Sequence, residues 1–378
     1  MLMRSSKFIK IFIKIIPIIL IVLLFDLIIN ILIPDNIKKK IGITRNYSIR
    51  TAQFHHEIVP NINLNEYWGT KKYNVTTNNY GMRILKNNSQ NLDTKKNHIG
   101  FIGDSFVYGS GINYEKHFIN LLQKKFKELS LLNLGYVSYS PSIYLKRLEY
   151  FIQEKKIKFD KVFIFVDPSD IQDEGVFYRE NKNGHILRKW LSDEENYEKL
   201  SKYKIKNYLQ QNSFLFKLQQ LLFLSSVTDI GVKCLNNKEN IIDFTNYLDA
   251  ERQSYGFDPE IQKKDWVIEG KNKVITYLDR IKELSKKENF DLIIVYYPSA
   301  LEVLNDFDFK KSMHYKLLYN WSNLSNTSFI DTSNDFDKAP KGLEGYKTNY
   351  IICDTHWNNN GHEIITENIS NFLNEKNN

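Results

Sequence analysis

Five short apolar runs, each followed by polar residues, constrain the fold of this chain more than any other feature of its sequence. The runs lie at 99–102, 129–134, 161–166, 292–297 and 328–330. Continuous apolar runs of this length are typical of strands that are buried on both faces, as in parallel sheets. Segments with helical spacing separate the runs, and another, 361–373, follows the last one. This alternation predicts βαβ units and an α/β fold with a parallel sheet.

The residues that follow these strands are candidates for a site, because the carboxyl ends of parallel strands meet at one edge of the sheet. The first strand ends at Gly103-Asp104-Ser105, and Gly109 and Gly111 follow. A serine at such a position, with backbone N–H groups around it, is a candidate nucleophile. The same tripeptide also occurs in ordinary turns, where Asp or Ser bonds to its own backbone. A catalytic interpretation therefore needs a base and an orienting acid elsewhere in the chain.

Both groups are found in one stretch just before the last helix. His356 can accept the proton of a serine hydroxyl, since the ordinary pKa of histidine lies near neutral pH. Asp354 lies two residues earlier, so in an extended segment both side chains point to the same side of the backbone. A carboxylate there can accept from the second ring nitrogen and fix the tautomer of the imidazole.

These stretches resemble a known family. Gly103-Asp104-Ser105, together with Asp354-Thr355-His356-Trp357-Asn358 and Gly361-His362, resembles the motifs of the SGNH (GDSL-like) hydrolase superfamily, and with the apolar segment at 15–33 the chain resembles a bacterial membrane-anchored member. Residues 77–83, 106–112 and 133–135 are also similar to that family. The resemblance covers roughly 75–172 and 288–375 and implies a flavodoxin-like parallel sheet in three layers.

The resemblance also implies roles for individual residues. Ser105 would be the nucleophile, His356 the base and Asp354 its orienting acid. The N–H of Ser105 would form part of the oxyanion hole.

Two further oxyanion donors depart from the family pattern. The second donor is usually a glycine, and here Ser138 takes that position, with Gly135 as the alternative. The third is usually the Asn of a Gly-x-Asn-Asp motif, and here Ser169 of Asp167-Pro168-Ser169-Asp170 takes it. Asp104, Asp170 and Trp357 are further candidates for contacts with substrate.

The function implied is that of a serine esterase or O-acyltransferase. It would act through an acyl-serine on O-acyl groups, commonly acetyl, of a cell-envelope carbohydrate. A membrane protein that supplies the acyl group is an expected partner for the transfer reaction. The chemistry needs no cofactor and no metal. The alternative function is that of a non-catalytic glycan-binding or assembly component, which Ser169 in place of Asn favours.

The first forty residues differ from the rest. Basic residues Arg4, Lys7, Lys10 and Lys14 precede or enter an apolar segment at 15–33, whose length is close to the roughly 20 residues that cross a bilayer. This pattern predicts a single-pass anchor in the cytoplasmic (inner) membrane with a periplasmic catalytic domain. A cleaved signal peptide is the competing interpretation, but no small-residue cleavage site follows Phe25.

The organisation predicted is an N-terminal tip and anchor at 1–40, a polar lead-in at 41–97 that packs on the core, and the α/β domain at 98–375. Residues 173–285 are too long for a simple crossover. Their periodicity, carried by apolar residues between Phe214 and Leu224, predicts a helical insertion. This insertion either shapes a substrate cleft or only adds packing.

Composition excludes some classes of function. The 378 residues are 42% hydrophobic and 14% aromatic, so the chain is long and apolar enough to fold around a core. The net charge is +8, but the lysines are dispersed, so a nucleic-acid partner is not indicated. Neither the two cysteines nor the histidines have the spacing of metal ligands, and His55-His56 is interpreted as a surface pair. Cys234 and Cys353 are either free thiols or one disulfide.

Overall fold

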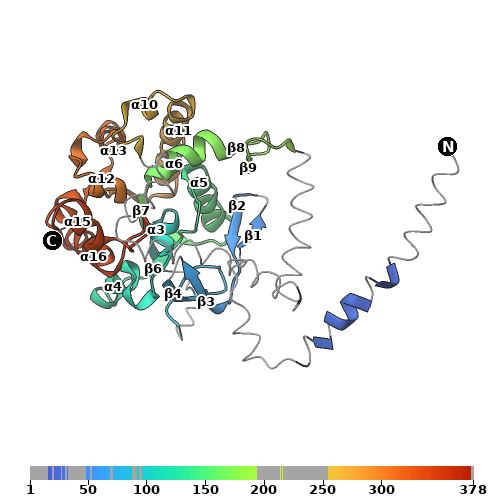
Figure 1. Cartoon of the computed structure of the whole chain (residues 1–378). Coiled ribbons are helices and arrows are strands. Elements are labelled where there is room, and N and C mark those ends of the chain that lie inside the picture. Colours follow the sequence, from blue (N-terminus) through green and yellow to red (C-terminus); the bar gives the residue numbers. More distant parts are fainter. Residues whose placement is uncertain are drawn as a thin grey trace.

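A five-stranded parallel sheet forms the centre of the molecule (Figure 1). The computed structural model describes residues 16–18, 21–26, 28–29, 32, 48–51, 53–68, 71–86, 92, 96–193, 213, 215 and 254–375. The strands of the sheet are β5 (Asn97–Ile102), β6 (Leu131–Asn133), β7 (Lys158–Phe165), β10 (Asp291–Tyr296) and β11 (Ser328–Asp331). They are the five apolar runs predicted above, so the α/β prediction is confirmed.

The strand order is that of a flavodoxin-like sheet. The order across the sheet is β11-β10-β7-β5-β6, and every neighbouring pair is parallel. Numbered along the chain, this is the order 2-1-3-4-5, in which the chain changes direction between its first and third strands. β5 is the first strand and pairs with β7, the third. The end of β5, where Ser105 follows, therefore lies at the topological switch point where such sheets bind ligands.

Helices cover both faces of the sheet because side chains alternate along each strand. Phe101 and Phe163 are paired in register, and their rings stack with centroids 5.0 Å apart. Phe101 also contacts Phe118 at the start of α4 (Phe118–Lys125), and Phe163 contacts Phe372 of α16 (Asn359–Glu375). The two helices pack against each other and cover this face.

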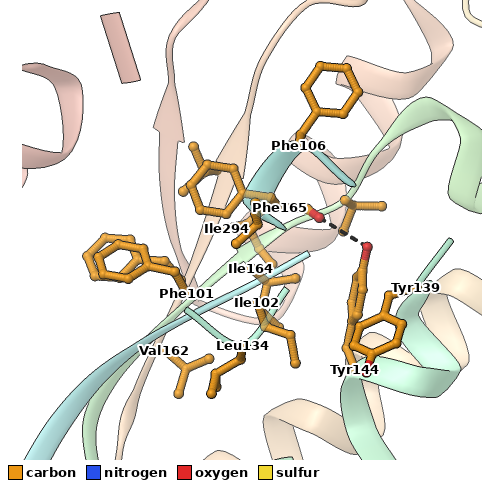
Figure 2. Close-up of a cluster of buried hydrophobic side chains, with 14 of the residues drawn as sticks. Phe101, Ile102, Phe106, Leu134, Tyr139, Tyr144, Val162, Ile164, Phe165 and Ile294 are labelled. Carbon is orange, nitrogen blue, oxygen red and sulfur yellow. Dashed lines mark hydrogen bonds between the residues drawn. The ribbon is translucent and has the colours of Figure 1, made fainter. Parts of the chain in front are cut away.

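The opposite face is covered by α5 (Pro141–Glu149) and α11 (Asp265–Glu288), which also pack against each other. Ile102 and Ile164 follow Phe101 and Phe163 by one residue and point to this side (Figure 2). Tyr144 of α5 is fully buried there, and its hydroxyl donates to the carbonyl of Phe165 over 3.3 Å. The core is therefore a three-layer sandwich.

Shorter elements connect these layers. The α-helices are α3 (Ser105–Tyr108), α6 (Pro168–Gln172), α10 (Pro259–Gln262), α12 (Ala300–Leu304), α13 (Met313–Leu324), α14 (Ser333–Phe336) and α15 (Gly342–Asn349). The 3-10 helices are η1 (Tyr114–Lys116) and η4 (Phe309–Lys311), and the π-helical turns are η2 (Tyr150–Glu154) and η3 (Asp173–Phe177).

Among the described residues, three antiparallel hairpins accompany the sheet. The lead-in forms two of them, β1 (Ser48–Thr51) with β2 (His55–Ile58), and β3 (Asn63–Trp68) with β4 (Lys71–Thr76), drawn in blue in Figure 1. The third joins β8 (Tyr178–Glu180) to β9 (Ile186–Arg188). The amide of Ile186 donates to the carbonyl of Gln53, so the third hairpin contacts the lead-in.

The structure corrects the prediction of a helical insertion at about 173–285 in one described part. Residues 178–188 form the β8–β9 hairpin, because Gly184 has a φ of 75° and the Asn181 side chain accepts from two amides of the turn. At the other end, α11 is the crossover helix into β10. The apolar residues on which the prediction was based lie outside the described residues: Phe214, Phe216, Leu218, Leu221, Leu222 and Leu224.

The membrane span predicted at 15–33 is covered only in part, and the residues described there are helical. In the described portion of the chain, no helix has the length and apolar character that crossing a bilayer requires.

Arg83 connects the lead-in to the loop that follows α3. Its side chain is buried, and its guanidinium donates to the carbonyls of Tyr108 and Asn74 over 2.9 Å and also to those of Gly109 and Ile112. The rings of Tyr73, Tyr108 and Tyr114 surround it at 5.1–5.5 Å. This one side chain therefore satisfies carbonyls on both sides of the boundary between the lead-in and the core.

Replacing Arg83 should destabilise the fold. In Arg83→Met, several buried carbonyls lose their donor, and each unsatisfied group costs about 1–3 kcal/mol. We expect the free energy of unfolding, measured by denaturant titration, to fall by about 3 kcal/mol or more. Arg179→Met is the control, because Arg179 pairs with the half-exposed Asp193 at the surface. Equal stability of the two variants would contradict this role of Arg83.

Candidate active site

Ser105 lies at the start of α3, directly after β5. The backbone turns sharply there, and a Cβ at Gly103 would come within 2.5 Å of the Val107 side chain, so this position requires glycine. Gly109 ends α3 with a φ of 83°, a conformation that glycine adopts without strain. These two glycines allow the four-residue helix to present Ser105 at the carboxyl end of the sheet.

The structure brings the three predicted catalytic residues together. The Ser105 hydroxyl lies 2.7 Å from Nε2 of His356, and Nδ1 of His356 lies 2.5 Å from Oδ1 of Asp354. A carboxylate can only accept, so Nδ1 carries the proton and Nε2 is left to accept from the serine. The same Asp354 oxygen accepts from the backbone amide of His356 over 2.8 Å. Serine, histidine and aspartate therefore form one directed chain of hydrogen bonds.

Tyr346 of α15 holds the loop that carries Asp354 and His356. Its buried hydroxyl donates toward the carbonyls of Asp354 and Ile351, at 2.7 and 2.9 Å, and accepts from the amide of Asp354 at 3.0 Å. Nearby, Cys353 has a φ of 63° and is disulfide-bonded. The described residues contain no free cysteine.

Two aromatic rings fix the orientation of the imidazole. Phe106 stacks on the His356 ring at 4.7 Å, and Trp68 of β3 meets it edge to face at 4.9 Å. Trp68 reaches the site from the lead-in, and nothing in its sequence context predicts this position. By contrast, the predicted substrate residue Trp357 is 1% exposed and packs against Phe106 and Tyr297, so its ring belongs to the core.

The environment of His356 favours its protonated form. Burial opposes protonation, but the charge of Asp354 and its hydrogen bond outweigh burial and raise the pKa of His356 above its ordinary value of 6.5. The imidazolium that forms when a base takes a proton is thus stabilised within the site.

Gly135, Ser138 and Ser169 are the candidates for the rest of the oxyanion hole, and they differ in whether the backbone amide already has a hydrogen-bond acceptor. The amide of Gly135 donates to Asn133 Oδ1 over 3.1 Å, so that alternative donor is already used. Ser138 has a φ of 58°, in the left-handed region that favours the glycine usual in the family resembled. The amide of Ser169 donates to Asp167 Oδ1 over 2.7 Å, which leaves the Ser169 hydroxyl as its donor.

Asp104 and Asp170 are placed as capping residues. Asp104 accepts from the amide of Phe106 at the start of α3, and Asp170 caps α6 and accepts from the Tyr144 hydroxyl. Burial and the nearby Asp167 raise the pKa of Asp104 to about 8. Both side chains are at most 3% exposed, so neither presents a carboxylate to a substrate from solvent.

A cavity of about 310 Å³ adjoins the site. Trp68 and Ser138 line it, together with Tyr136, Tyr178, Arg50 and the histidine pair His55-His56. His55 and His56 are buried, which corrects the interpretation of this pair as a surface feature. Within the described residues, no group of three or more His, Cys, Asp or Glu side chains is arranged to hold a metal ion.

The pKa of His356 can be measured directly. In a titration followed by NMR of the ring, the pKa of His356 should lie above 6.5 in the wild type. In Asp354→Asn, burial acts without the opposing charge, so this pKa should fall below the wild-type value. An unchanged pKa in Asp354→Asn would contradict the arrangement described here, and His185→Gln, in the β8–β9 turn, serves as the control.

Comparison with known proteins gives similar folds without close relatives in sequence. No family model and no curated protein matches the chain. Among solved structures, it is similar to a member of the lipolytic protein G-D-S-L family from Veillonella parvula, at 11% identity and a TM-score of 0.38, over 73% of this chain and 97% of that one. It is also similar to the psychrotrophic esterase EstA from a Pseudoalteromonas species, at 12% identity and a TM-score of 0.38, over 75% of this chain and 100% of that one.

A third similar structure is a catalytic mutant of an acetylxylan esterase from Geobacillus stearothermophilus, at 14% identity and a TM-score of 0.37, over 72% of this chain and 92% of that one. Similarity at these TM-scores supports no conclusion about function. The function proposed below rests on the geometry of the site. These three solved structures that the chain is similar to are thus one G-D-S-L family protein and two esterases.

Proposed function

We propose that this protein is a serine esterase or O-acyltransferase that acts on O-acyl groups, typically acetyl, of a cell-envelope carbohydrate. The observation that carries the proposal is the chain of hydrogen bonds from Ser105 through His356 to Asp354, at 2.7 and 2.5 Å. Such a chain activates a hydroxyl that is otherwise a poor nucleophile. Asp354, which comes from the same loop as His356, fixes the tautomer that this chemistry needs.

The reaction follows from this geometry in two halves. The Ser105 oxygen attacks the ester carbonyl while Nε2 of His356 takes its proton, and the same nitrogen then protonates the leaving sugar oxygen. The acyl group is left on Ser105. Water or a sugar hydroxyl attacks next while His356 takes its proton, and His356 then gives that proton to the Ser105 oxygen as the bond to the acyl group breaks. Donors from Ser105, Ser138 and Ser169 would stabilise the negative oxygen in both halves.

The cavity beside Ser138 and Trp68 supports a carbohydrate substrate. Its volume of about 310 Å³ lies at the small end of the range of ligand pockets, about 300–1,000 Å³. Its lining combines aromatic faces, such as Trp68 and Tyr178, with hydroxyl, carboxylate and guanidinium groups. Aromatic faces pack on the C–H face of a sugar ring, while polar groups take its hydroxyls.

The catalytic assay uses the full chain in detergent with an acetyl-ester reporter and a serine-reactive phosphonate. We expect turnover and covalent labelling in the wild type and neither in Ser105→Ala, because the nucleophile is gone. Asp354→Asn should retain the fold and lose about 10⁴-fold in kcat.

The activity should also depend on pH. Only neutral His356 can act as base, so activity should fall as the pH drops through the raised pKa of His356. In the wild type, the midpoint of this fall should lie above pH 6.5.

The alternative, a non-catalytic glycan-binding component, is favoured by one observation. Ser169 stands where the resembled family has Asn, and its amide is already bonded to Asp167. Absence of labelling in a folded wild-type protein would support this alternative and contradict catalysis. If turnover occurs, products formed with a glycan acceptor separate transfer from hydrolysis, and transfer would call for a membrane partner that donates the acyl group.

We further propose that residues 15–33 anchor the protein in the cytoplasmic membrane and that the α/β domain is periplasmic. Large apolar side chains are exposed there, among them Ile18 at 61%, Ile21 at 65% and Leu32 at 73%. The disulfide at Cys353 fits an oxidising compartment.

The anchor can be tested by fractionation. The full chain should sediment with membranes and resist extraction by high salt and alkali, and protease should reach its α/β domain only from the periplasmic side. Recovery of the full chain in the soluble fraction, or digestion from the cytoplasmic side, would contradict the proposed localisation.

A further inference from the structure

A chain of hydrogen bonds joins the histidine pair of the lead-in to the loop after β6, which carries Ser138. Nε2 of His56 lies 2.7 Å from the carbonyl oxygen of Val137, and Nδ1 of His56 lies 2.8 Å from Nδ1 of His55. The guanidinium of Arg50 contacts the ring of His55. Arg50 lies opposite His56 in the β1–β2 register, so one hairpin carries all three residues.

The partners at the two ends fix the direction of this chain. A carbonyl oxygen can only accept, so Nε2 of His56 carries its proton. In a neutral imidazole the other nitrogen then accepts, which means that Nδ1 of His55 donates to Nδ1 of His56. Nε2 of His55 is left to accept from Arg50, which has only donors. Every group from Arg50 to Val137 therefore points its proton toward the loop after β6.

Both imidazoles are held in the neutral form. Burial, and then the charge of Arg50, lower the pKa of His56 to about 3, and burial followed by His56 and Arg50 lowers that of His55. The rings of Tyr136 and Tyr139 lie 5.6 and 5.2 Å from that of His56. The direction of the chain thus stays the same throughout the neutral pH range.

The carbonyl at the end of this chain belongs to the candidate oxyanion hole. The carbonyl of Val137 and the N–H of Ser138 are two ends of one planar peptide group. A hydrogen bond to the carbonyl fixes the plane and polarises the amide, which makes its N–H a stronger donor. His55 and Ser138 have φ values of 71° and 58°, and such strained conformations persist only where the surroundings impose them.

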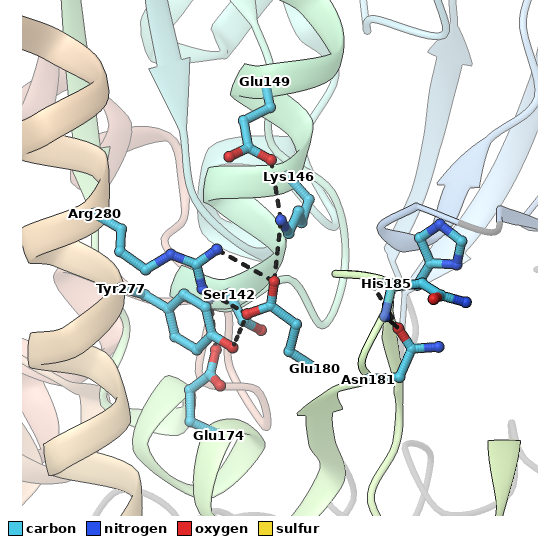
Figure 3. A network of polar contacts seen from close by, with 10 residues as sticks. Ser142, Lys146, Glu149, Glu174, Glu180, Asn181, His185, Tyr277 and Arg280 are labelled. Atoms are coloured by element: carbon cyan, nitrogen blue, oxygen red, sulfur yellow. Dashed lines mark hydrogen bonds and ion pairs between the residues drawn. The ribbon is translucent and has the colours of Figure 1, made fainter. Parts of the chain in front are cut away.

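The next peptide is held as well. The hydroxyl of Tyr178 donates to the carbonyl of Ser138 over 2.8 Å. Tyr178 begins β8, and Glu180 at the end of this strand is bound by Lys146 of α5 and by Tyr277 and Arg280 of α11 (Figure 3). The loop that carries Ser138 is therefore restrained from the lead-in on one side and from the β8–β9 hairpin on the other.

We propose that His56, oriented by His55 and Arg50, is a positioning residue that aims and polarises the Ser138 N–H toward the oxyanion formed at Ser105. This inference rests on the proposed acyl-transfer function, since it assigns the support of that site. It gives the lead-in a part in the reaction that His56 exerts through the Val137–Ser138 peptide, since both of its ring nitrogens are already bonded to protein groups.

Two substitutions at one position separate positioning from packing. His56→Leu removes the donor to Val137, whereas the side-chain amide of His56→Gln can still donate. We expect His56→Leu to lower kcat by about 10–100-fold with little change in KM. Loss of a whole oxyanion donor lowers kcat by roughly 10²–10³-fold, and His56→Leu only weakens one. His56→Gln should recover most of that loss, and His185→Gln should match the wild type. Equal kcat values for His56→Leu and the wild type, or for His56→Leu and His56→Gln, would overturn the proposal.

A second readout needs no catalysis. Val137-Ser138 is the only Val-Ser pair in the sequence, so labelling valine at its carbonyl carbon and serine at its nitrogen selects one amide signal. In the full chain, this signal should shift in His56→Leu and stay near its wild-type position in His56→Gln and His185→Gln. An unshifted signal in His56→Leu would overturn the inference even if the enzyme is active. If the wild type lacks turnover while the signal shifts as expected, the proposed function fails and the contact of His56 with this peptide stands.

Discussion

The hydrogen bond between Ser105 and His356 joins residues that are 251 positions apart, so it forms only when the α/β fold is complete. Ser105 is placed by the end of β5, and His356 by the loop between α15 and α16. The two meet because a parallel sheet gathers the carboxyl ends of its strands at one edge, and β5 lies at the point where strand order reverses. The glycine turn at 103 and the restraint of the Asp354 loop by Tyr346 supply the rest of this geometry.

The segment before the sheet contributes more than packing. Trp68 meets the ring of the proposed base, His56 binds the peptide of a proposed oxyanion donor, and Arg83 connects the lead-in to the loop after α3. These contacts reach the site from separate parts of the lead-in. Many of the contacts around the proposed active site are therefore made by residues that precede β5.

The sequence predicts the sheet and the central residues well for a physical reason. Strands buried on both faces are continuous apolar runs, and the residues directly after them lie at one edge, which predicts the position of Ser105. Asp354 and His356 lie in the loop before the last helix, and their pairing with Ser105 is implied by the chemistry of the three side chains and by the resemblance of the motifs. Contacts that depend on tertiary packing cannot be predicted in this way. Neither the burial of His55-His56 nor the position of Trp68 against His356 has a periodic signal. The bond from the Gly135 amide to Asn133 and the left-handed backbone of Ser138 are likewise visible only in the structure.

The proposed reaction requires that Ser105 carries the acyl group between its two halves. Mass spectrometry of the full chain quenched during turnover of an acetyl ester, followed by mapping of the modified peptide, measures this. We expect one acetyl group on the peptide that contains Ser105, and none in Ser105→Ala. An active protein that never carries this group, or that carries it on another residue, would contradict the proposed function.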